Sequence, residues 1–359
     1  MKRYVYCLFF ILVFTACKTK NDLALNFVSE FILQDSIQFN NTTIGGLSAV
    51  DKLNDTYFFV VDDAKKPRFL KATISIEKDT ISSVNFLEVT SLKDSLHSFY
   101  TQNALDLETI FIDETKQEIY FSSEGNIQQG KNPTIFKSDL KGNFISDFQL
   151  PKGFTKTGNI MHNAAFEGAA ESTDKKGFWA IMEAPLKADG EAPTFVKKAA
   201  PVRVTYFDKN LKKATKQFVY ELEHITKPAK GAVNLNGATA ILQYNSNTFF
   251  IVERTYQSGY GSYGNIVRIF EAIITEKSTN VIVVDSLKSK NYIPLKKRLL
   301  LNFDTEKEKL SHQFIDNIEG ITLGPVLENG NPSLLLVSDD NFQLYGKQLN
   351  QFILLEILR

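Results

Sequence analysis

LETIFIDETKQEIYFSSEGNIQQGKNPTIFKSDLKGNFISDFQL, residues 107–150, contains four short apolar or β-branched runs separated by polar turns. The runs are ETIFID, EIYFSSE, TIFKSDL and FISDFQL, and turn residues such as DETKQ and KGN connect them. Runs rich in Ile, Phe, Tyr and Thr between polar turns are typical of strands in an antiparallel meander. This stretch therefore predicts one four-stranded unit of about 45 residues.

The same unit recurs along the chain. GGLSAVDKLNDTYFFVVDD opens a copy at residue 45, DLETI at 106, FEGAAES at 166, NGATAILQYNSNTFFIVER at 236 and NIEGITLG at 317. Sequential four-stranded meanders predict an all-β fold, a β-propeller in which each blade packs on the next around an axis. We count five blades, or six if KKRLLLNF, residues 296–303, belongs to a degenerate blade. The neighbouring DTEKEKL is more typical of a short helix or a solvated insertion. A two-sheet sandwich is the structural alternative, but it leaves the repeat unexplained.

The last unit shows only three strands in its sequence. The run EFILQDSIQFN, residues 30–40, has no unit of its own. We expect it to complete the last blade from the N-terminal side, which closes the ring and removes free sheet edges. Residues 30–359 are accordingly predicted to form a single propeller domain.

Composition limits the kinds of partner. The chain has 359 residues, 43% of them hydrophobic, with 29 Phe and 13 Tyr, which is ample for a large core. Lys plus Arg and Asp plus Glu both number 41, so no net charge recruits nucleic acid or an anionic membrane. We expect a monomer that acts on a small molecule.

The N-terminal residues MKRYVYCLFFILVFTAC predict export. Lys2 and Arg3 precede an apolar run that is shorter than the ~20 residues of a membrane span. FTAC resembles a lipobox, which makes residues 1–16 a lipoprotein signal peptide, Cys17 the lipidated residue and residues 17–29 a polar tether. The protein would then be lipid-anchored in the bacterial envelope. An uncleaved anchor or an ordinary secretory signal is the alternative.

Acidic residues bracket the strand pairs of the repeated units. In a hairpin the start of the first strand and the end of the second lie at the same end. The acids should therefore gather around one mouth of the central channel. The candidate metal ligands at these positions are Asp62, Glu108, Glu124, Glu167, Glu183, Glu253, Glu319 and Asp339.

Carboxylates crowded into one mouth repel one another unless they share protons or hold cations. Oxygen ligands without His or Cys favour Ca²⁺ or Mg²⁺ over zinc or copper. Asp and Glu are also depleted in strands and at their ends, so their recurrence at one position favours a metal, with Ca²⁺ expected. The alternative is that individual acids cap turns or pair with Lys and Arg.

Several segments resemble a known family. They are GLSAVDKLNDTYFFVVDDAKKPRFL, DLETIFIDETKQEIYFSSEGN, NAAFEGAAESTDKKGFWAIMEAPL, TFFIVERTYQSGYG and DNIEGITLGPVLENGNPSLLLVSDDNF. They resemble the signature segments of the bacterial phytase-like domain, also described as the esterase-like activity of phytase family, over residues 44–342. The resemblance implies an exported propeller related in fold to calcium-dependent β-propeller phytases. The family name suggests hydrolysis of esters or phosphoesters, without an agreed set of catalytic residues.

Basic residues beside the acids suggest a phosphate-binding function. Lys65 and Arg68 follow Asp62 closely, Arg254 is next to Glu253, and Tyr256 lies in an aromatic loop. A guanidinium next to a metal-binding carboxylate can bind phosphate in a bidentate manner. We take Lys65, Arg68, Arg254 and Tyr256 as candidate substrate-binding residues, and Glu167, Glu319 and Arg254 as candidate catalytic residues. A structural ion pair between Glu253 and Arg254 is the alternative.

Two classes of function follow. The first is a calcium-dependent hydrolase of phosphate esters, in which metal-activated water attacks while Arg254 and Arg68 stabilise the developing charge. The second is a non-catalytic envelope propeller that binds a ligand or protein, with structural calcium. Hydrolysis of a carboxylic ester or lactone would need the same acids but not the arginines.

Overall fold

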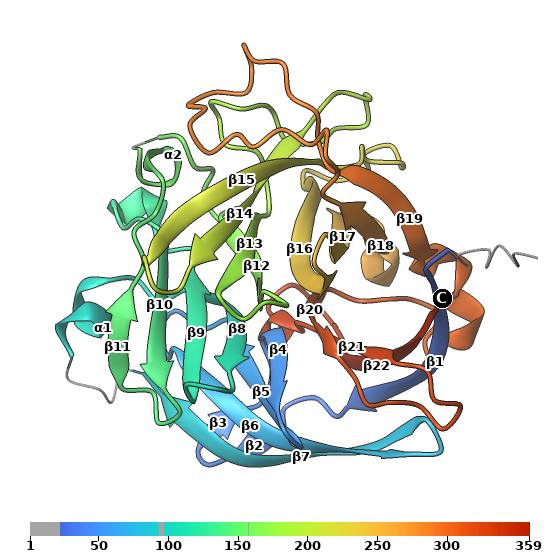
Figure 1. Ribbon diagram of the computed structural model, residues 1–359. Helices are drawn as coiled ribbons and strands as arrows, with labels where there is room; N and C mark the ends of the chain where they lie inside the picture. The colour runs from blue at the N-terminus through green and yellow to red at the C-terminus, as the bar shows by residue number, and fades with distance from the viewer. Residues whose placement is uncertain (1–21, 93–96, 157) are drawn as a thin grey trace, which may run out of the picture.

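The computed structural model describes residues 22–92, 97–156 and 158–359, and it shows a β-propeller with five four-stranded blades. The predicted all-β fold and the count of five blades are confirmed. In each blade the first strand lies next to the axis and the later strands lie progressively further out, as Figure 1 shows for the inner strands β4, β8, β12, β16 and β20. Two short α-helices and several 3₁₀ turns are the only helical segments of this described part. None of its helices has the length and apolarity to cross a membrane.

The strands of the first three blades follow one another along the chain. Blade 1 contains β4 (Leu47–Leu53), β5 (Thr56–Val61), β6 (Arg68–Glu77) and β7 (Thr80–Ser91); blade 2 contains β8 (Leu107–Asp113), β9 (Glu118–Ser123), β10 (Thr134–Asp139) and β11 (Phe144–Asp147); blade 3 contains β12 (Phe166–Glu171), β13 (Gly177–Met182), β14 (Pro201–Asp208) and β15 (Lys213–Glu221). A small hairpin of β2 (Gln38–Phe39) and β3 (Thr42–Thr43) precedes blade 1.

Blades 4 and 5 complete the ring. Blade 4 contains β16 (Asn234–Asn245), β17 (Thr248–Gln257), β18 (Asn265–Ile273) and β19 (Lys296–Asn302); blade 5 contains β20 (Ile318–Leu323), β21 (Ser333–Ser338), β22 (Asn350–Leu358) and β1 (Ala24–Leu33). The run at 296–303 is therefore the outer strand of blade 4 and not part of a sixth blade. The residues after it form the 3₁₀ turns Phe303–Thr305 and Lys307–Lys309, as expected of a short helical insertion.

The N-terminal strand closes the ring as predicted, but its bounds differ from the expected ones. β1 pairs antiparallel with β22 from Ala24 to Leu33, so the strand begins inside the segment 17–29 that was expected to be a tether. The alternation in ALNFVS supplies the physical reason, because Leu25 packs against the core of blades 4 and 5 while its neighbours face outward. The export signal and Cys17 lie outside the described residues.

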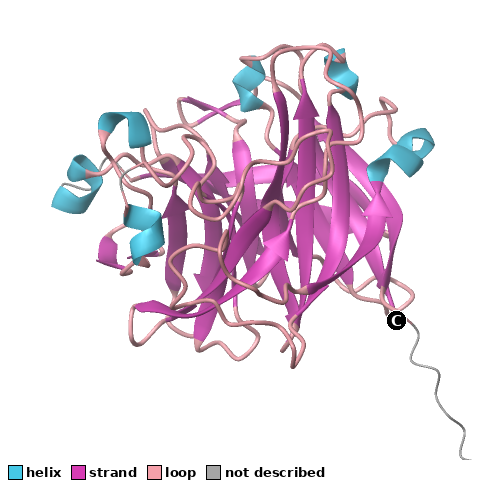
Figure 2. Cartoon of the chain, turned by 90° about the horizontal axis from the view of Figure 1, so that it is seen from above, coloured by secondary structure: helices cyan, strands magenta, loops and turns pink. Residues whose placement is uncertain are grey.

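Apolar side chains between neighbouring blades form the core. Blades 2 and 3 meet through aromatic rings, among them Phe178 and Phe207, stacked 5.0 Å apart, and Phe111, 5.1 Å from Phe178. The helical segments α1 (Ser98–Gln102) and α2 (Lys152–Thr155) and the 3₁₀ turns lie in connections at the end where each first strand begins, and Figure 2 shows the strands from the side. The connections that carry these helical segments therefore surround one mouth of the channel.

Candidate metal centre

Each inner strand contains a β-bulge near its mouth end, at an equivalent position in all five blades. The pairing of first and second strands skips one residue in each blade, which leaves that residue unpaired and bends the strand. The five residues at this bulge position are Ser48, Glu108, Glu167, Thr239 and Glu319. A bulge re-aims its side chain, and here it directs three glutamates of one repeat position to the same mouth.

A second equivalent position follows each second strand, at the same end of the hairpin. We call it the rim position, and its residues are Asp62, Glu124, Glu183, Arg254 and Asp339. The backbone pairing is equivalent in each blade: Asp62 donates its N–H to Gly46, Glu124 to Asp106, Glu183 to Ala165 and Asp339 to Asn317, and Arg254 pairs with Gly237. Four blades thus supply an acid here, and blade 4 supplies a guanidinium.

Together with Asp106, the acids at these positions form what we call the acid ring: Asp62, Asp106, Glu108, Glu124, Glu167, Glu183, Glu319 and Asp339. The ring is largely removed from water. Glu124 is 3% exposed and Asp339 is 2% exposed, whereas Asp62 and Asp106 are half-buried at the mouth. The structure therefore brings together seven of the eight predicted ligands.

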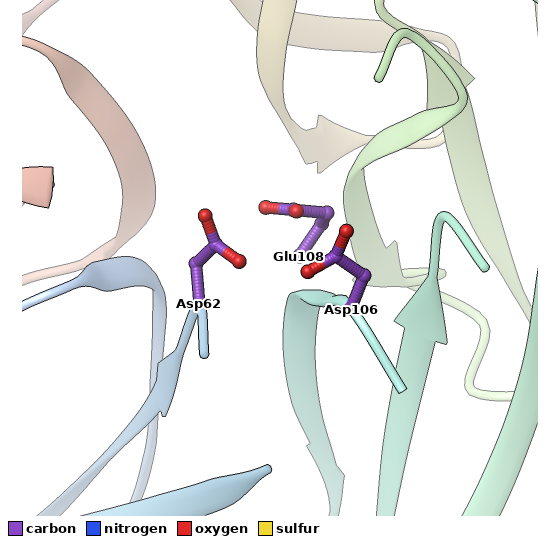
Figure 3. A group of neighbouring side chains, drawn as sticks. All are labelled: Asp62, Asp106 and Glu108. Atoms are coloured by element: carbon purple, nitrogen blue, oxygen red, sulfur yellow. The ribbon is translucent and has the colours of Figure 1, made fainter. Parts of the chain in front are cut away.

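Two overlapping triads within the ring have the spacing of a cation site. Single carboxylate oxygens of Asp62, Asp106 and Glu108 lie within 4.8 Å of one another, and so do those of Glu108, Glu124 and Glu167. Figure 3 shows the first triad, with Asp62 reaching from the end of β5 toward Asp106 and Glu108 at the start of β8. Glu108 belongs to both triads, so two cations held there would share it.

Burial raises the pKa values of the ring carboxyls. Desolvation, and next the charge of Glu183, raise the pKa of Glu124 to about 8. Desolvation also raises the pKa of Asp62, Glu108, Glu167 and Asp339 well above the usual range, with neighbouring carboxylates adding to the effect. The ring consequently retains protons near neutral pH unless cations replace them.

Arg254 and Ser48 stabilise the ionised form of the ring carboxyls, Arg254 through its positive charge and Ser48 through hydrogen bonds. A guanidinium nitrogen of Arg254 lies 3.3 Å from Glu183 Oε1 and 3.3 Å from Glu319 Oε1. The hydroxyl of Ser48 lies 2.7 Å from Glu108 Oε2 and 3.0 Å from Glu319 Oε2, and Asn317 donates to Glu319 at 2.9 Å. Buried Glu124 Oε2 has no hydrogen-bond partner among the described residues.

Glu253 does not join the ring, contrary to the prediction. It is fully buried on the other face of β17, where it accepts hydrogen bonds from Tyr220, Asn236 and Lys297. The reason is strand alternation, because the residue of blade 4 at the rim position is Arg254 and its neighbour must face the opposite side. Glu253 is a structural ion-pair partner.

Arg68 also lies elsewhere. Its guanidinium is bound to Asp63 at 2.8 Å, to the carbonyls of Lys66 and Thr43, and packs over Phe342, so it holds the loop after β5 together. Lys65 is exposed in the same loop. Tyr256 lies two residues beyond Arg254 in β17 and so on the same strand face, toward the mouth.

Asp106 is the ring member that the bracket pattern did not predict. It precedes β8 and pairs with Glu124 through a backbone hydrogen bond of 2.9 Å. A signal for it was present, because it stands two residues before Glu108 as Asn317 stands two before Glu319. Asp340, by contrast, accepts bonds from Gly46 and Asn350 and anchors its loop.

The chain belongs to the phytase-like family, described as esterase-like activity of phytase, whose model matches residues 42–342. No curated protein matches the chain significantly.

The chain is similar to several solved structures at low sequence identity. An endo-arabinase from Bacteroides thetaiotaomicron is 12% identical, with 88% of this chain and 95% of that chain covered and a TM-score of 0.47. The catalytic domain of a GH62 α-L-arabinofuranosidase from Coprinopsis cinerea is 10% identical, with coverages of 93% and 97% and a TM-score of 0.48. A thermostable family-43 glycoside hydrolase is 11% identical, with coverages of 88% and 90% and a TM-score of 0.48.

Proposed function

We propose that this protein is a calcium-dependent hydrolase of phosphate esters that acts in the bacterial envelope. The observation that carries the proposal is the acid ring, in which eight carboxyl groups from four blades converge on one guanidinium from the fifth. Family membership supports hydrolysis as the reaction class. The anchoring of the protein through Cys17 is part of the same proposal.

The residues of the ring fit a hard divalent cation. All ligand atoms are oxygens, which is the donor set that Ca²⁺ prefers, and the two triads offer three carboxylates each within 4.8 Å. Buried Glu124 is the second indication: its Oε2 has no N–H or hydroxyl partner among the described residues and lies against the carboxyl of Glu167, and two buried carboxyls in contact need a shared proton or a cation. Asp62, Asp106, Glu108, Glu124 and Glu167 would hold the ions.

Calcium bound there would polarise a phosphoryl oxygen and lower the pKa of an attacking water. The half-buried carboxyls of Asp62 and Asp106 place the first triad at the mouth, where a substrate arrives from solvent. Glu124 and Glu167 lie deeper and are 3% and 5% exposed. The mouth triad is therefore the part of the ring that meets the substrate.

Arg254 supplies the positive charge for a phosphoryl group. Its side chain is 13% exposed, its contacts to Glu183 and Glu319 are long at 3.3 Å, and its Nε has no hydrogen-bond partner among the described residues. Charge from Glu319, Glu183 and Glu167 raises its pKa against the effect of burial, so it stays a cation. It can therefore turn to a phosphoryl oxygen as charge develops there.

Glu167 and Glu319 are the proposed proton-transfer residues. Burial and the charges of Glu124 and Glu183 raise the pKa of Glu167 well above its usual range. When calcium occupies the mouth triad alone, the Glu167 carboxyl would stay protonated and could give the proton that a leaving oxygen needs. Glu319 is fixed by Ser48, Asn317 and Arg254, which makes it suited to accept a proton at a defined position. Tyr256 and Lys65 would contact the remainder of the substrate.

The direct test uses the mature protein with phytate and simple phosphate esters, in calcium or in a chelator. Release of phosphate only with calcium is the expected result. If no phosphate is released under either condition, the proposed reaction is wrong.

The depth of the second triad favours one rival function, a non-catalytic propeller with structural calcium. The triad members Glu108, Glu124 and Glu167 are each at most 6% exposed, which suits an ion that stays bound. A calorimetric screen of phosphorylated and ester ligands separates the two, because tight binding without turnover supports the rival.

A further inference from the structure

A cavity of about 340 Å³ lies at the outer edge of blade 3. Its walls come from the connection at 149–154, from strand β15, and from residues 282–285 of the long connection between β18 and β19; Leu186 and, from β14, Arg203 complete the lining. β15 is the fourth strand of its blade, so at about 4.8 Å per strand the cavity lies roughly 14 Å outward from the inner strand β12. It is distinct from the acid ring.

The connection at 274–295 holds the cavity in a fixed shape. Val281 and Leu295 donate backbone hydrogen bonds of 2.7 and 2.8 Å to β15, and Leu287 N donates to Asp189 Oδ1 at 3.0 Å. Val281 and Leu287 also pack with Val219 as a small apolar cluster. Figure 1 shows this orange segment beside β15 at the periphery of the ring. The cavity is therefore preformed.

A buried guanidinium lines this cavity. Arg203 is 4% exposed, and it donates to both oxygens of Asp189 at 2.7 and 2.9 Å, to Gln217 Oε1 at 2.9 Å and to the carbonyl of Val284 at 2.8 Å. A guanidinium has five N–H donors, so these four bonds orient the group and leave one N–H on Nη1 for a ligand. Asp189 balances its charge.

The remaining lining combines basic side chains with apolar ones. The exposed residues Lys152 and Lys213 outnumber Asp285, the acid among the lining residues. Leu150, Pro151, Phe154, Leu186, Ile282 and Val284 supply the apolar surface. Apolar walls with a few fixed polar groups are the usual composition of a small-molecule site, and the volume lies at the lower end of the ordinary range.

We propose that this cavity binds a small organic anion with an apolar body, such as an aromatic carboxylate or sulfonate. The anionic group meets the free N–H of Arg203 and the amines of Lys152 and Lys213, and the apolar body packs on the partly exposed side chains of Leu150, Ile282 and Val284. Charge complementarity selects anions, because the lining has two amines and one acid.

The test uses 1-anilinonaphthalene-8-sulfonate with the full mature protein, followed by fluorescence and calorimetry. We expect saturable binding of one probe per chain, competition by 2-naphthoate, and weak competition by the neutral 2-naphthylmethanol. Hydrogen exchange should slow in residues 281–288 when the probe binds. This last readout locates the site without any substitution.

Charge reversal provides the matched comparison. Lys152→Glu combined with Lys213→Glu should weaken probe binding about tenfold or more, whereas Lys197→Glu, an equal charge change on another exposed loop, should not. Lys213→Gln serves if the double variant does not fold. Calcium or a chelator should leave probe binding unchanged, which separates this site from the acid ring. Binding that is absent at millimolar probe, insensitive to these variants, or without protection of 281–288 would overturn the proposal.

Discussion

Arg254 and Glu253 are adjacent in β17 and point to opposite faces of blade 4: Arg254 reaches Glu183 and Glu319 in the channel, whereas Glu253 is paired with Lys297 inside the blade. Arg254 therefore belongs to the candidate site, whereas the residue before it, Glu253, belongs to a structural ion pair. The two side chains have different expected effects when they are replaced.

Arg254→Ala should lower kcat for phosphate esters about 10²–10³-fold, because it removes a charge that acts on the developing phosphoryl anion. Arg254→Lys should recover only part of this loss, since an ammonium lacks the two-pronged geometry. Any hydrolysis of carboxylic esters or lactones should be spared. Steady-state kinetics on both substrate classes check this, and an unchanged phosphate-ester kcat in Arg254→Ala would remove the arginine from the mechanism.

Glu108→Gln should weaken calcium binding more than any other single change, because Glu108 belongs to both triads. Glu253→Gln is the matched control: it should lower thermal stability by leaving Lys297 without its buried partner, yet leave calcium affinity unchanged. Titration calorimetry and thermal melts together distinguish the two. Equal calcium affinities in the two variants would contradict the assignment of the ring.

The stability gained from calcium should increase with pH. Glu124 has a folded-state pKa of about 8 against an ordinary 4.5, so its contribution to stability is fully present below about 4.5 and is lost as pH rises through 8 in the absence of metal. Calcium replaces the protons, so its effect should be small at pH 5 and large at pH 8. At one hundred times its Kd, one bound ion adds about 2.7 kcal/mol. Melting curves with calcium and with chelator at both pH values measure it.

Gly168→Ala should destabilise the propeller by about 1–3 kcal/mol through overpacking. A Cβ at Gly168 would lie 2.8 Å from Ile241 N and 2.9 Å from Ala240 Cα, which are backbone atoms of the neighbouring inner strand. Gly153→Ala is the control, because its Cβ would meet the movable side chain of Leu186 at 3.3 Å. Chemical denaturation compares them, and equal stabilities would show that blades 3 and 4 can separate at the channel.

Cys17→Ser should release the protein from the membrane fraction without changing the soluble domain. The lipid would be attached at this residue, and the described domain begins only a few residues later with β1 at Ala24. Fractionation of cells that express either form checks the anchor. Retention of the Cys17→Ser protein in the membrane would point to an uncleaved signal.

The repeated patterns predicted the blades well because each hairpin carries its own turn and its own alternation. LETI, FEGA and IEGI mark the inner strands of blades 2, 3 and 5, and all three place a glutamate at the bulge. Such local signals do not depend on the rest of the fold. The closing strand was predicted for a similar reason, although its start at Ala24 was missed because a single edge strand has no hairpin partner in sequence.

The details of the ring needed the three-dimensional register. β16 and β17 are the longest inner pair, so the rim position of blade 4 lies inside β17 and not after its end, which made Glu253 look equivalent to the other acids. Arg68 follows two acids in sequence, yet it is the first residue of β6 and turns back to Asp63. The three-dimensional register decides where Glu253 and Arg68 lie, and a local sequence pattern does not reveal it.

The pairing of β1 with β22 affects the order in which the blades can fold during synthesis. Strand β22 lies between β21 and β1, so blade 5 has neither its third strand nor its paired fourth strand until β22 has been synthesised. An emerging chain can form blades 1 to 4 in order, but the ring can close only after β22 is available to pair with β1. This order delays assembly of the full acid ring, because Glu319 and Asp339 belong to the blade that forms last.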